Sequence, residues 1–347
     1  MNKMKLSQFK FAYPKTLIAK TPKVPRDACK LMVINSQTRE IQSHKFSKVI
    51  DYMNEGDVLV LNDTKVFPAR LYGNKEKTKA KIEVFLLRQL SETENIWDVV
   101  VDPARKVRIG NRIFLNKNVF CEVIDNTTSR GRIVRFNVKD DFRKVIEKLG
   151  KTPLPFYIKR EPTEKDKEMY QTIYAKNVGS VAAPAAGLHF TKELLKKIQQ
   201  KGVKIAYITL HLGLGMFRLV EVEDLSKHRM DSEFYEITKE NSDIINQSII
   251  KKKKVIAVGT SVCRAIESSV ITGEYVRPSR GWTDRFIHPP NSMSIVSKVI
   301  TNFHPPQSTM LMLACTLAER DDVMKAYKKA IKENYKFLAY GDAMMIV

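Results

Sequence analysis

Residues 253–270 read KKVIAVGTSVCRAIESSV, an apolar run that breaks at a glycine and continues with helical spacing. The run Val255–Val258 is typical of a buried strand, and the segment after it is typical of a helix that packs on a sheet. Two further apolar runs, VKIAYITLHLG (203–213) and VSKVITNFH (296–304), are also strand-like and alternate with helical stretches. This alternation predicts an α/β main domain, a mixed sheet with helices.

A different pattern occupies the stretch from residue 73 to residue 151. It opens with the charged segment GNKEKTKAK and continues with short β-rich runs at hairpin spacing, namely KIEVFLLRQL, IWDVVVD, NRIFL, FCEVID and GRIVRFNV. Several such strands in about 70 residues predict a small antiparallel β-barrel. Because the flanking sequence differs, we expect a barrel domain, 73–151, inserted into a discontinuous α/β domain made of 1–72 and 152–347.

The charge balance favours a polyanionic partner. The 347 residues include 60 Lys and Arg against 38 Asp and Glu, which leaves a net charge of +22. Such a field attracts nucleic acid and makes its association depend on salt. The alternative explanation is a lysine-rich surface that is simply solvated, and we favour the nucleic-acid partner.

Several classes of protein are disfavoured. The four cysteines are scattered and show no metal-ligand spacing, so we expect no metal. The first residues lack the apolar core of a signal peptide and no run approaches a membrane span, so we expect a cytoplasmic protein without a membrane partner. Neither GxGxxG nor GxxxxGK[ST] occurs in the expected context, which argues against Rossmann-type dehydrogenases and methyltransferases and against P-loop ATPases.

The loop SVAAPAAGLHFT (180–191) stands out because it is almost free of charge. Its proline and glycine break regular structure, and its alanines leave the backbone bare for a flat ligand. Thr191 is a candidate N-cap for the helical stretch that follows, so His189 and Phe190 lie just before a helix N-terminus. The alternative interpretation is a buried hinge in which His189 is a core histidine, and the loop alone does not decide between them.

Loops at the carboxyl ends of strands are where α/β sheets bind ligands. The polar, aromatic and glycine residues of these loops are Asp63, Thr64, Lys65, Arg70, His211, Gly213, Gly215, Phe217, Arg264, Asn302, His304, Tyr340 and Asp342. Some have structural explanations: the glycine pair as a β-bulge, and Arg264 as an ion pair with Glu267 on one helix face. Three of the six histidines fall in these loops and in the loop 180–191, which favours a functional interpretation.

The sequences of these loops resemble those of a known protein family. LNDTKVFPARL, SVAAPAAGLHFT, TLHLGLGMFRLV, GWTDRFI, ITNFHPPQSTMLML and YGDAMMIV are similar to phrases of the S-adenosylmethionine:tRNA ribosyltransferase-isomerases of queuosine biosynthesis. They occur in the same order over the full length. The resemblance implies an α/β domain with an inserted barrel. It also implies transfer of the ribosyl moiety of S-adenosylmethionine to 7-aminomethyl-7-deazaguanine in tRNA, giving epoxyqueuosine with release of adenine and methionine.

Roles follow from this resemblance as hypotheses. We expect His189 and His211 to act as base and proton shuttle, with Asp63 or Asp342 orienting an imidazole or binding ribose hydroxyls. Expected substrate-binding residues are Thr64, Phe190 and Phe217 (the two rings stacking on adenine), Gly213, Gly215, Arg264 (holding the methionine carboxylate), Asn302, His304, Tyr340 and Asp342. Lys65 and Arg70 are expected to face RNA phosphate. The tRNA anticodon arm is expected in a basic groove between the barrel and the main domain, edged by Lys75, Lys77, Lys79 and Lys81.

The sequence departs from the family pattern at Ala185, where Thr is common, and at Cys263 within GTSVCR. S-adenosylmethionine is expected to be consumed as a ribosyl donor, with no recycled cofactor, and the molecule is expected to be a monomer. Two alternatives stay open. One is a non-catalytic RNA-binding protein, and the other is an S-adenosylmethionine-dependent RNA methyltransferase of unusual fold.

Overall fold

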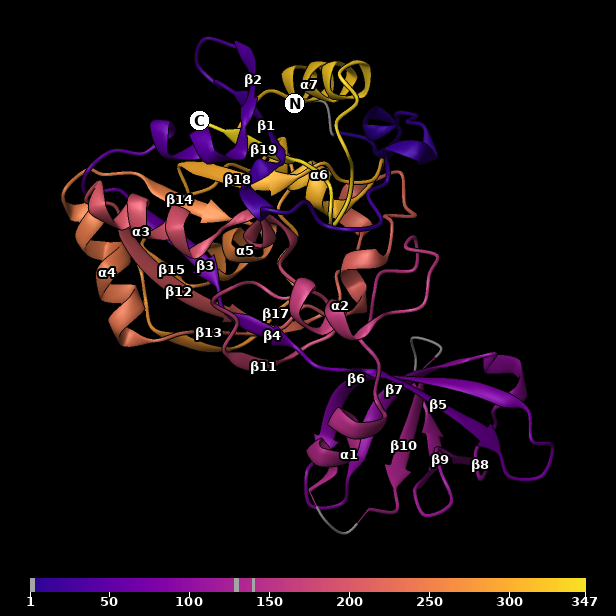
Figure 1. Ribbon diagram of the computed structural model, residues 1–347. Coiled ribbons are helices and arrows are strands. Elements are labelled where there is room, and N and C mark those ends of the chain that lie inside the picture. The colour runs from indigo at the N-terminus through magenta and orange to yellow at the C-terminus, as the bar shows by residue number, and fades with distance from the viewer. Residues whose placement is uncertain (1–3, 128–130, 139–140) are drawn as a thin grey trace.

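The computed structural model describes residues 4–127, 131–138 and 141–347 and consists of a large α/β domain with a small barrel beside it (Figure 1). A nine-stranded mixed sheet forms the large domain, which confirms the predicted fold class. Across the sheet the strands are β17 (Ser279–Thr283), β13 (Glu233–Ile237), β12 (Lys204–Leu210), β3 (Val58–Asn62), β14 (Val255–Val258), β18 (Lys298–Asn302), β19 (Ala343–Ile346), β1 (Lys30–Ile34) and β2 (Ile41–Lys45).

The four central strands β12, β3, β14 and β18 run parallel, so their carboxyl ends share one edge of the sheet. The antiparallel strands β13 and β17 extend the sheet on one side. On the other side β19 is antiparallel to β18, and β1 is parallel to β19. The loops after the central strands therefore converge, as the sequence pattern predicts for a ligand site.

Helices bury both faces of the central strands. Val58 and Val60 face a core shared with α4 to α7, whereas Leu59 and Leu61 face a second core that contains α3. Because successive strand residues point to opposite faces, burial of both faces requires the continuous apolar runs seen in the sequence. The helices are α3 (Lys192–Gln200), α4 (Lys239–Ile250), α5 (Thr260–Ser268), α6 (Thr309–Ala314) and α7 (Arg320–Lys332).

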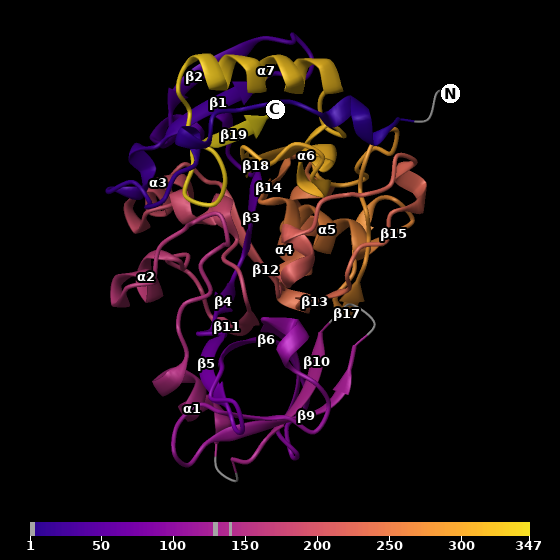
Figure 2. The ribbon, with the colours of Figure 1, turned by 90° about the vertical axis from the view of Figure 1, so that its right-hand side faces the viewer.

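The inserted segment forms a closed antiparallel barrel whose strands curve round a ring in Figure 2. In order around the barrel they are β10 (Arg132–Phe136), β7 (Ile96–Asp102), β6 (Lys81–Ser91), β5 (Arg70–Lys75), β8 (Arg112–Phe114) and β9 (Phe120–Asn126). Helix α1 (Phe142–Leu149) packs Phe142 against Phe136, with ring centroids 4.2 Å apart.

The two chain connections between barrel and main domain lie against each other. The proposed boundary at residue 73 falls within β5, and the chain leaves the barrel at Gly150. A Cβ placed on Gly150 would lie 2.1 Å from the carbonyl oxygen of Pro68, on the entering connection. The junction is therefore closely packed backbone.

Short elements complete the fold: the parallel pair β4 (Thr64–Val66) and β11 (Asn177–Ser180), the hairpin β15 (Val270–Ile271) and β16 (Tyr275–Val276), and helix α2 (Glu164–Met169). The predicted cap is found, since Thr191 accepts a hydrogen bond from the backbone of Leu194. Within the described ranges, no helix has the length and apolarity that crossing a membrane requires.

Candidate active site

Two adjoining hollows open at the carboxyl ends of β14 and β18. The larger has a volume of about 870 Å³ and the smaller about 60 Å³. The residues that line both are Ala183, Ala185, Asn302, His304 and Met310. The loop 180–191 and the exit of β18 thus form the partition between them.

The loop 180–191 is held tightly in place. The Ser180 hydroxyl accepts from the Leu212 amide at 2.9 Å and donates to the Ala182 carbonyl at 2.6 Å. Gly187 lies so close to the Tyr174 hydroxyl that a Cβ would approach it to 2.2 Å. The small residues of this loop therefore have two structural roles. The alanines line the hollows, and Gly187 leaves room for the tyrosine.

His189 and Phe190 lie in the interior rather than on either hollow. His189 is buried, with Nδ1 3.2 Å from the sulfur of Cys29 and Nε2 3.2 Å from the amide nitrogen of Asn302. Burial, followed by the charge of Arg26, lowers the pKa of His189 to about 4. The ring of Phe190 is fully buried and packs edge-on against Phe46, so it offers no face for adenine.

The structure brings His211, Thr64 and Asp63 together at the exit of β3 and β12. His211 Nδ1 lies 2.8 Å from the Thr64 hydroxyl, and burial lowers the pKa of His211 to about 4. The Asp63 carboxylate accepts from the Thr209 hydroxyl at 2.6 Å and from the Asn177 amide at 3.0 Å. These three predicted residues line neither hollow, and Asp63 ties neighbouring strands together.

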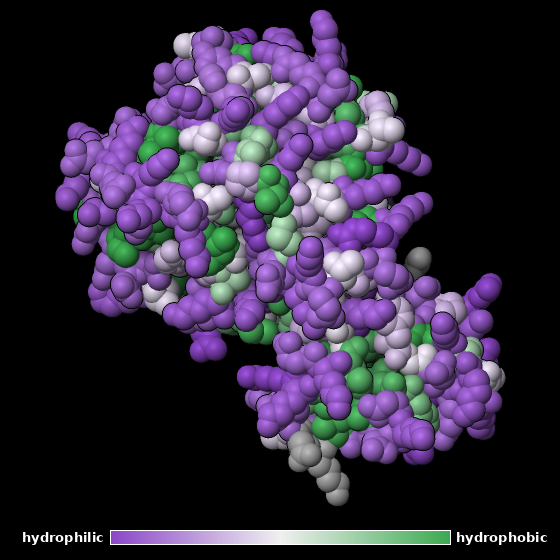
Figure 3. Space-filling model, viewed as in Figure 1, coloured by the Kyte–Doolittle hydropathy of each residue, from purple (hydrophilic) through white to green (hydrophobic). Residues whose placement is uncertain are grey.

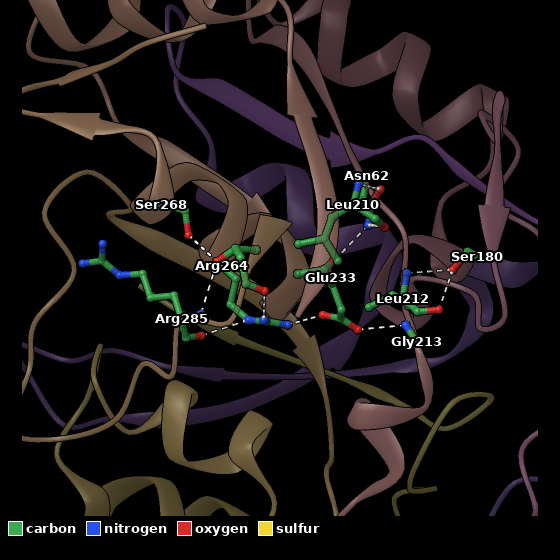
Figure 4. Close-up of polar contacts among 11 residues, drawn as sticks. Asn62, Ser180, Leu210, Leu212, Gly213, Glu233, Arg264, Ser268 and Arg285 are labelled. Atoms are coloured by element: carbon green, nitrogen blue, oxygen red, sulfur yellow. Dashed lines mark hydrogen bonds and ion pairs between the residues drawn. The ribbon is translucent and has the colours of Figure 1, made fainter. Parts of the chain in front are cut away.

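Glu233 of β13 connects two of the predicted residues, and sequence reasoning missed it. It pairs with Arg264 and accepts from the Gly213 amide at 2.8 Å (Figure 4). The Arg264 guanidinium also donates to the carbonyls of Arg285 and Thr283, at 3.0 Å and 3.1 Å. Burial raises the pKa of Glu233, and the charge of Arg264 opposes that rise. Both side chains line the smaller hollow, where the guanidinium is already engaged.

His304 and Asn302 are the predicted residues that line both hollows. His304 Nε2 lies 2.6 Å from the Thr301 hydroxyl, and burial lowers the pKa of His304 to about 3. The side-chain oxygen of Asn302 is buried and has no hydrogen-bond partner among the described residues.

Tyr340 and Asp342, which were predicted from the last strand region, lie just before β19 and differ in their surroundings. The Tyr340 hydroxyl is buried without a hydrogen-bond partner among the described residues, and its ring packs edge-on against Tyr170. Asp342 accepts from the backbone amides of Lys30 and Lys336, at 2.7 Å and 2.6 Å. Asp342 therefore joins the start of β1 to the loop before β19 and is not presented to a hollow.

The remaining predicted residues lie elsewhere. Gly215 packs against Asp231, and the side chain of Phe217 lies outside the described residues. Arg70 pairs with Glu83 at 2.7 Å and donates to the Leu154 carbonyl. Lys65 is exposed on β4, and Lys75, Lys77, Lys79 and Lys81 lie at the turn between β5 and β6, at the end of β5 opposite Arg70.

Lysines that the sequence pattern did not single out surround the larger hollow. Lys15 and Lys20, from the N-terminal segment, and Lys159, from the linker after the barrel, line it and are exposed. The same hollow is lined by the rings of Tyr13 and Tyr157. A cationic rim around aromatic walls is a surface suited to a nucleotide.

Comparison with known proteins gives a consistent result. A family model described as "Queuosine biosynthesis protein" matches residues 6–346. The S-adenosylmethionine:tRNA ribosyltransferase-isomerase of Chloroherpeton thalassium is 55% identical over 347 residues, covering 99% of this chain and 100% of that protein. That of Cytophaga hutchinsonii is 54% identical over 348 residues, covering 99% and 100%. The crystal structure of S-adenosylmethionine tRNA ribosyltransferase from Thermotoga maritima is similar at a TM-score of 0.55 and 32% identity, covering 98% of this chain and 100% of that chain.

Proposed function

The chain belongs to the queuosine biosynthesis protein family and is an S-adenosylmethionine:tRNA ribosyltransferase-isomerase, and from this premise we propose its substrates and products. It transfers the ribosyl moiety of S-adenosylmethionine to 7-aminomethyl-7-deazaguanine at the wobble position of a tRNA and isomerises it. The product is epoxyqueuosine in the tRNA, and adenine and methionine are released. S-adenosylmethionine is thus consumed as a donor and is not recycled as a cofactor.

The larger hollow is the observation that carries this proposal. Its volume of about 870 Å³ lies within the range of pockets that enclose a small ligand. It adjoins the carboxyl end of the parallel strand β18 at Asn302, and Ala183 and Ala185 leave its wall bare. The half-buried rings of Tyr13 and Tyr157 line it as well, so we assign stacking on adenine to these two rings in place of the buried Phe190.

The proposed reaction needs a proton acceptor, because the sulfonium of the donor acidifies the neighbouring ribose methylene. Of the three histidines singled out in the sequence, His304 is the one that lines the hollows. Burial lowers its pKa to about 3, so the ring is unprotonated at pH 7 and is a weak base until a bound ligand changes its surroundings. The proposal therefore moves the proton-transfer role from His189 and His211 to His304.

We propose that Arg264 does not hold the methionine carboxylate, which is the role expected from the sequence. Its guanidinium pairs with Glu233, so most of its charge is neutralised within the protein. We assign to this pair the shaping of the smaller hollow, where it holds the Gly213 loop against α5.

The tRNA anticodon arm is proposed to approach over the rim of the larger hollow. Lys15, Lys20 and Lys159 stand there and can pair with phosphates. Hydrophilic side chains cover most of the face seen in Figure 3, on the main domain and on the barrel. The lysines of the β5–β6 turn do not line this hollow, so we place the primary contact at the rim.

One incubation tests the function. The full chain is mixed with S-adenosylmethionine labelled in its ribose and with tRNA that carries 7-aminomethyl-7-deazaguanine. We expect adenine and methionine in solution and label on the tRNA, in equal amounts. The same tRNA with unmodified guanine at the wobble position is the control and should take up no label.

The rival functions give different products. An RNA methyltransferase would release S-adenosylhomocysteine and leave the ribose label in solution. A non-catalytic RNA-binding protein would bind the tRNA and release neither adenine nor methionine. Either result would overturn the proposed reaction.

A further inference from the structure

Asn302, the last residue of β18, has a side chain whose orientation is fixed from one side. Its amide nitrogen donates to the Leu338 carbonyl at 3.2 Å and lies 3.2 Å from His189 Nε2. A carbonyl only accepts, so the side chain cannot be flipped end for end without placing two oxygens against each other. The contact with Leu338 therefore decides which end of the amide faces the interior.

This orientation also decides the tautomer of His189. The Asn302 amide nitrogen can only donate, so His189 Nε2 accepts from it and the imidazole proton lies on Nδ1. That proton is directed at the sulfur of Cys29, 3.2 Å away. Burial lowers the pKa of His189 and raises the pKa of Cys29, so the chain Cys29–His189–Asn302 is uncharged at pH 7.

The other end of the Asn302 amide is left without a partner. The residue is 2% exposed, and its side-chain oxygen has no hydrogen-bond donor among the described residues. Leaving a buried acceptor unpaired is unfavourable, and proteins rarely do so without a reason. Since Asn302 lines both hollows, a ligand that enters them is the available donor.

We propose that the side-chain oxygen of Asn302 accepts a hydrogen bond from an N–H group of the sulfonium nucleoside, and that His189 is a positioning residue that holds the amide in this orientation. The inference rests on the proposed function for the identity of the ligand. The nucleoside has two sources of N–H, the exocyclic amine of the purine and the ammonium of the amino-acid part. His189 then acts through Asn302 and transfers no proton.

Substitution of His189 separates positioning from proton transfer. In His189→Gln the side-chain oxygen can replace Nε2 as acceptor for Asn302, whereas His189→Leu removes the acceptor. We expect His189→Gln to keep kcat and the KM for the donor within about fivefold of the unsubstituted protein, because it keeps the hydrogen bond. We expect His189→Leu to raise the donor KM roughly ten- to a hundredfold and to leave the tRNA KM unchanged. A hundredfold loss of kcat in His189→Gln would overturn the proposal, since it would show that the imidazole itself reacts.

Asn302→Ala completes a double-mutant cycle. If both residues act through one oxygen, adding His189→Leu to Asn302→Ala should raise the donor KM by less than about twofold more. Fully multiplicative effects on the donor KM would contradict the shared route.

Donor analogues then identify the N–H group, one analogue lacking the purine amine and the other lacking the ammonium. Asn302→Ala should weaken binding of the complete donor but not of the analogue that lacks the group bound by Asn302. Equal weakening for both analogues would refute recognition of either group.

Two further measurements test the proposal if the protein does not turn over or if a variant does not fold. Calorimetric binding of S-adenosylmethionine without tRNA tests the Asn302 contact whether or not the protein turns over, so failure of the proposed reaction does not decide this inference. If His189→Leu does not fold by circular dichroism, Asn302→Ser replaces it, because it shortens the side chain without removing all polarity. Unchanged donor affinity in Asn302→Ser and Asn302→Ala would overturn the proposal.

Discussion

Burial of an imidazole links folding to pH at the residue scale. The pKa of His189 is lowered from 6.5 to about 4, chiefly by burial, so the folded chain takes up this proton at lower pH than the unfolded chain does. Between pH 6.5 and pH 4 the unfolded chain binds this proton and the folded chain does not. The free energy of unfolding is therefore highest above pH 6.5 and falls as the pH falls toward 4. When the pH is lowered from 6.5 to 4, the free energy of unfolding should fall less for His189→Gln than for the unsubstituted protein. The difference between the two losses should be on the order of 3 kcal/mol at pH 4. Urea unfolding at a series of pH values measures this, and parallel curves would contradict it.

His304 gives the corresponding prediction for activity. It is the strand-end histidine on the wall of both hollows, and a positioned proton acceptor typically contributes a factor of about 10² to 10⁴. His304→Gln should therefore lower kcat for adenine release by at least about a hundredfold. His44→Gln is the control, because His44 lies on β2 at the far edge of the sheet, bonded to Tyr52. Equal turnover in the two variants would remove His304 from the reaction.

Removal of one partner of a buried ion pair is a sharp test of stability. Glu233 and Arg264 are 4% and 7% exposed, so Glu233→Gln leaves a buried guanidinium without its carboxylate. We expect a loss of about 3 kcal/mol or more in the free energy of unfolding. Glu94→Gln, which breaks the exposed pair with Arg135, should cost less than about 1 kcal/mol. Urea unfolding at pH 7 compares them, and similar losses would contradict the role given to the buried pair.

Residue types and strand ends were enough to predict that Asn302 and His304 lie where loops converge, because the end of a buried strand fixes where the next side chains lie, and both residues line the two hollows. The same reasoning could not place His189. Its loop has no periodicity, so nothing in the sequence shows that the histidine turns toward Cys29 and away from the hollow. Glu233 did leave a signal. In EFYEI it takes an inward position of an alternating strand, where an ionised side chain requires a partner.

At the scale of elements, the sequence predicted the parallel strands best. Their apolar runs are uninterrupted because helices cover both faces, as in β14, which is buried throughout. The edge strands β2 and β17 are largely exposed and carry polar residues, so their sequences do not differ from those of loops. They form through pairing with β1 and β13, which is a property of the fold and not of the segment.

The junction of the two domains offers a test at this scale. A Cβ on Gly150 would meet the backbone oxygens of Pro68 and Ile146 at 2.1 Å and 2.5 Å, which the backbone has no room to relieve. We expect Gly150→Ala to lower the free energy of unfolding by about 1–3 kcal/mol or more through overpacking. Gly281→Ala in β17 is the matched control, since no other described residue comes within 4 Å of its Cβ, and it should change stability by less than about 0.5 kcal/mol. Thermal unfolding of both variants decides, and an unchanged midpoint for Gly150→Ala would show that the connections separate readily.

On the scale of the whole molecule, the inserted barrel and the charge were predicted for different reasons. Hairpin spacing is a local property, so the sequence revealed the barrel, whereas the contact of its Arg88 with the Trp282 ring, 5.0 Å apart, joins residues remote in sequence. The net charge of +22 is likewise visible in composition, but composition does not say where lysines gather. The rim formed by Lys15, Lys20 and Lys159 is assembled from two segments that only the fold brings together.

If the tRNA contacts the rim, the salt dependence of its binding should depend on the rim lysines and not on lysines elsewhere. Each lysine that pairs with a phosphate releases counterions, so the logarithm of the affinity falls with the logarithm of salt concentration in proportion to the number of pairs. We expect steep weakening for the unsubstituted chain between about 50 mM and 200 mM salt. Replacing Lys15 and Lys20 with Ala should lower that slope by about 1.5–2. The control replaces Lys196 and Lys197, exposed on α3 at the other face of the sheet, and removes the same charge. Since both double variants have equal net charge, equal slopes would mean that the whole field attracts the RNA and that the rim makes no direct contact with it.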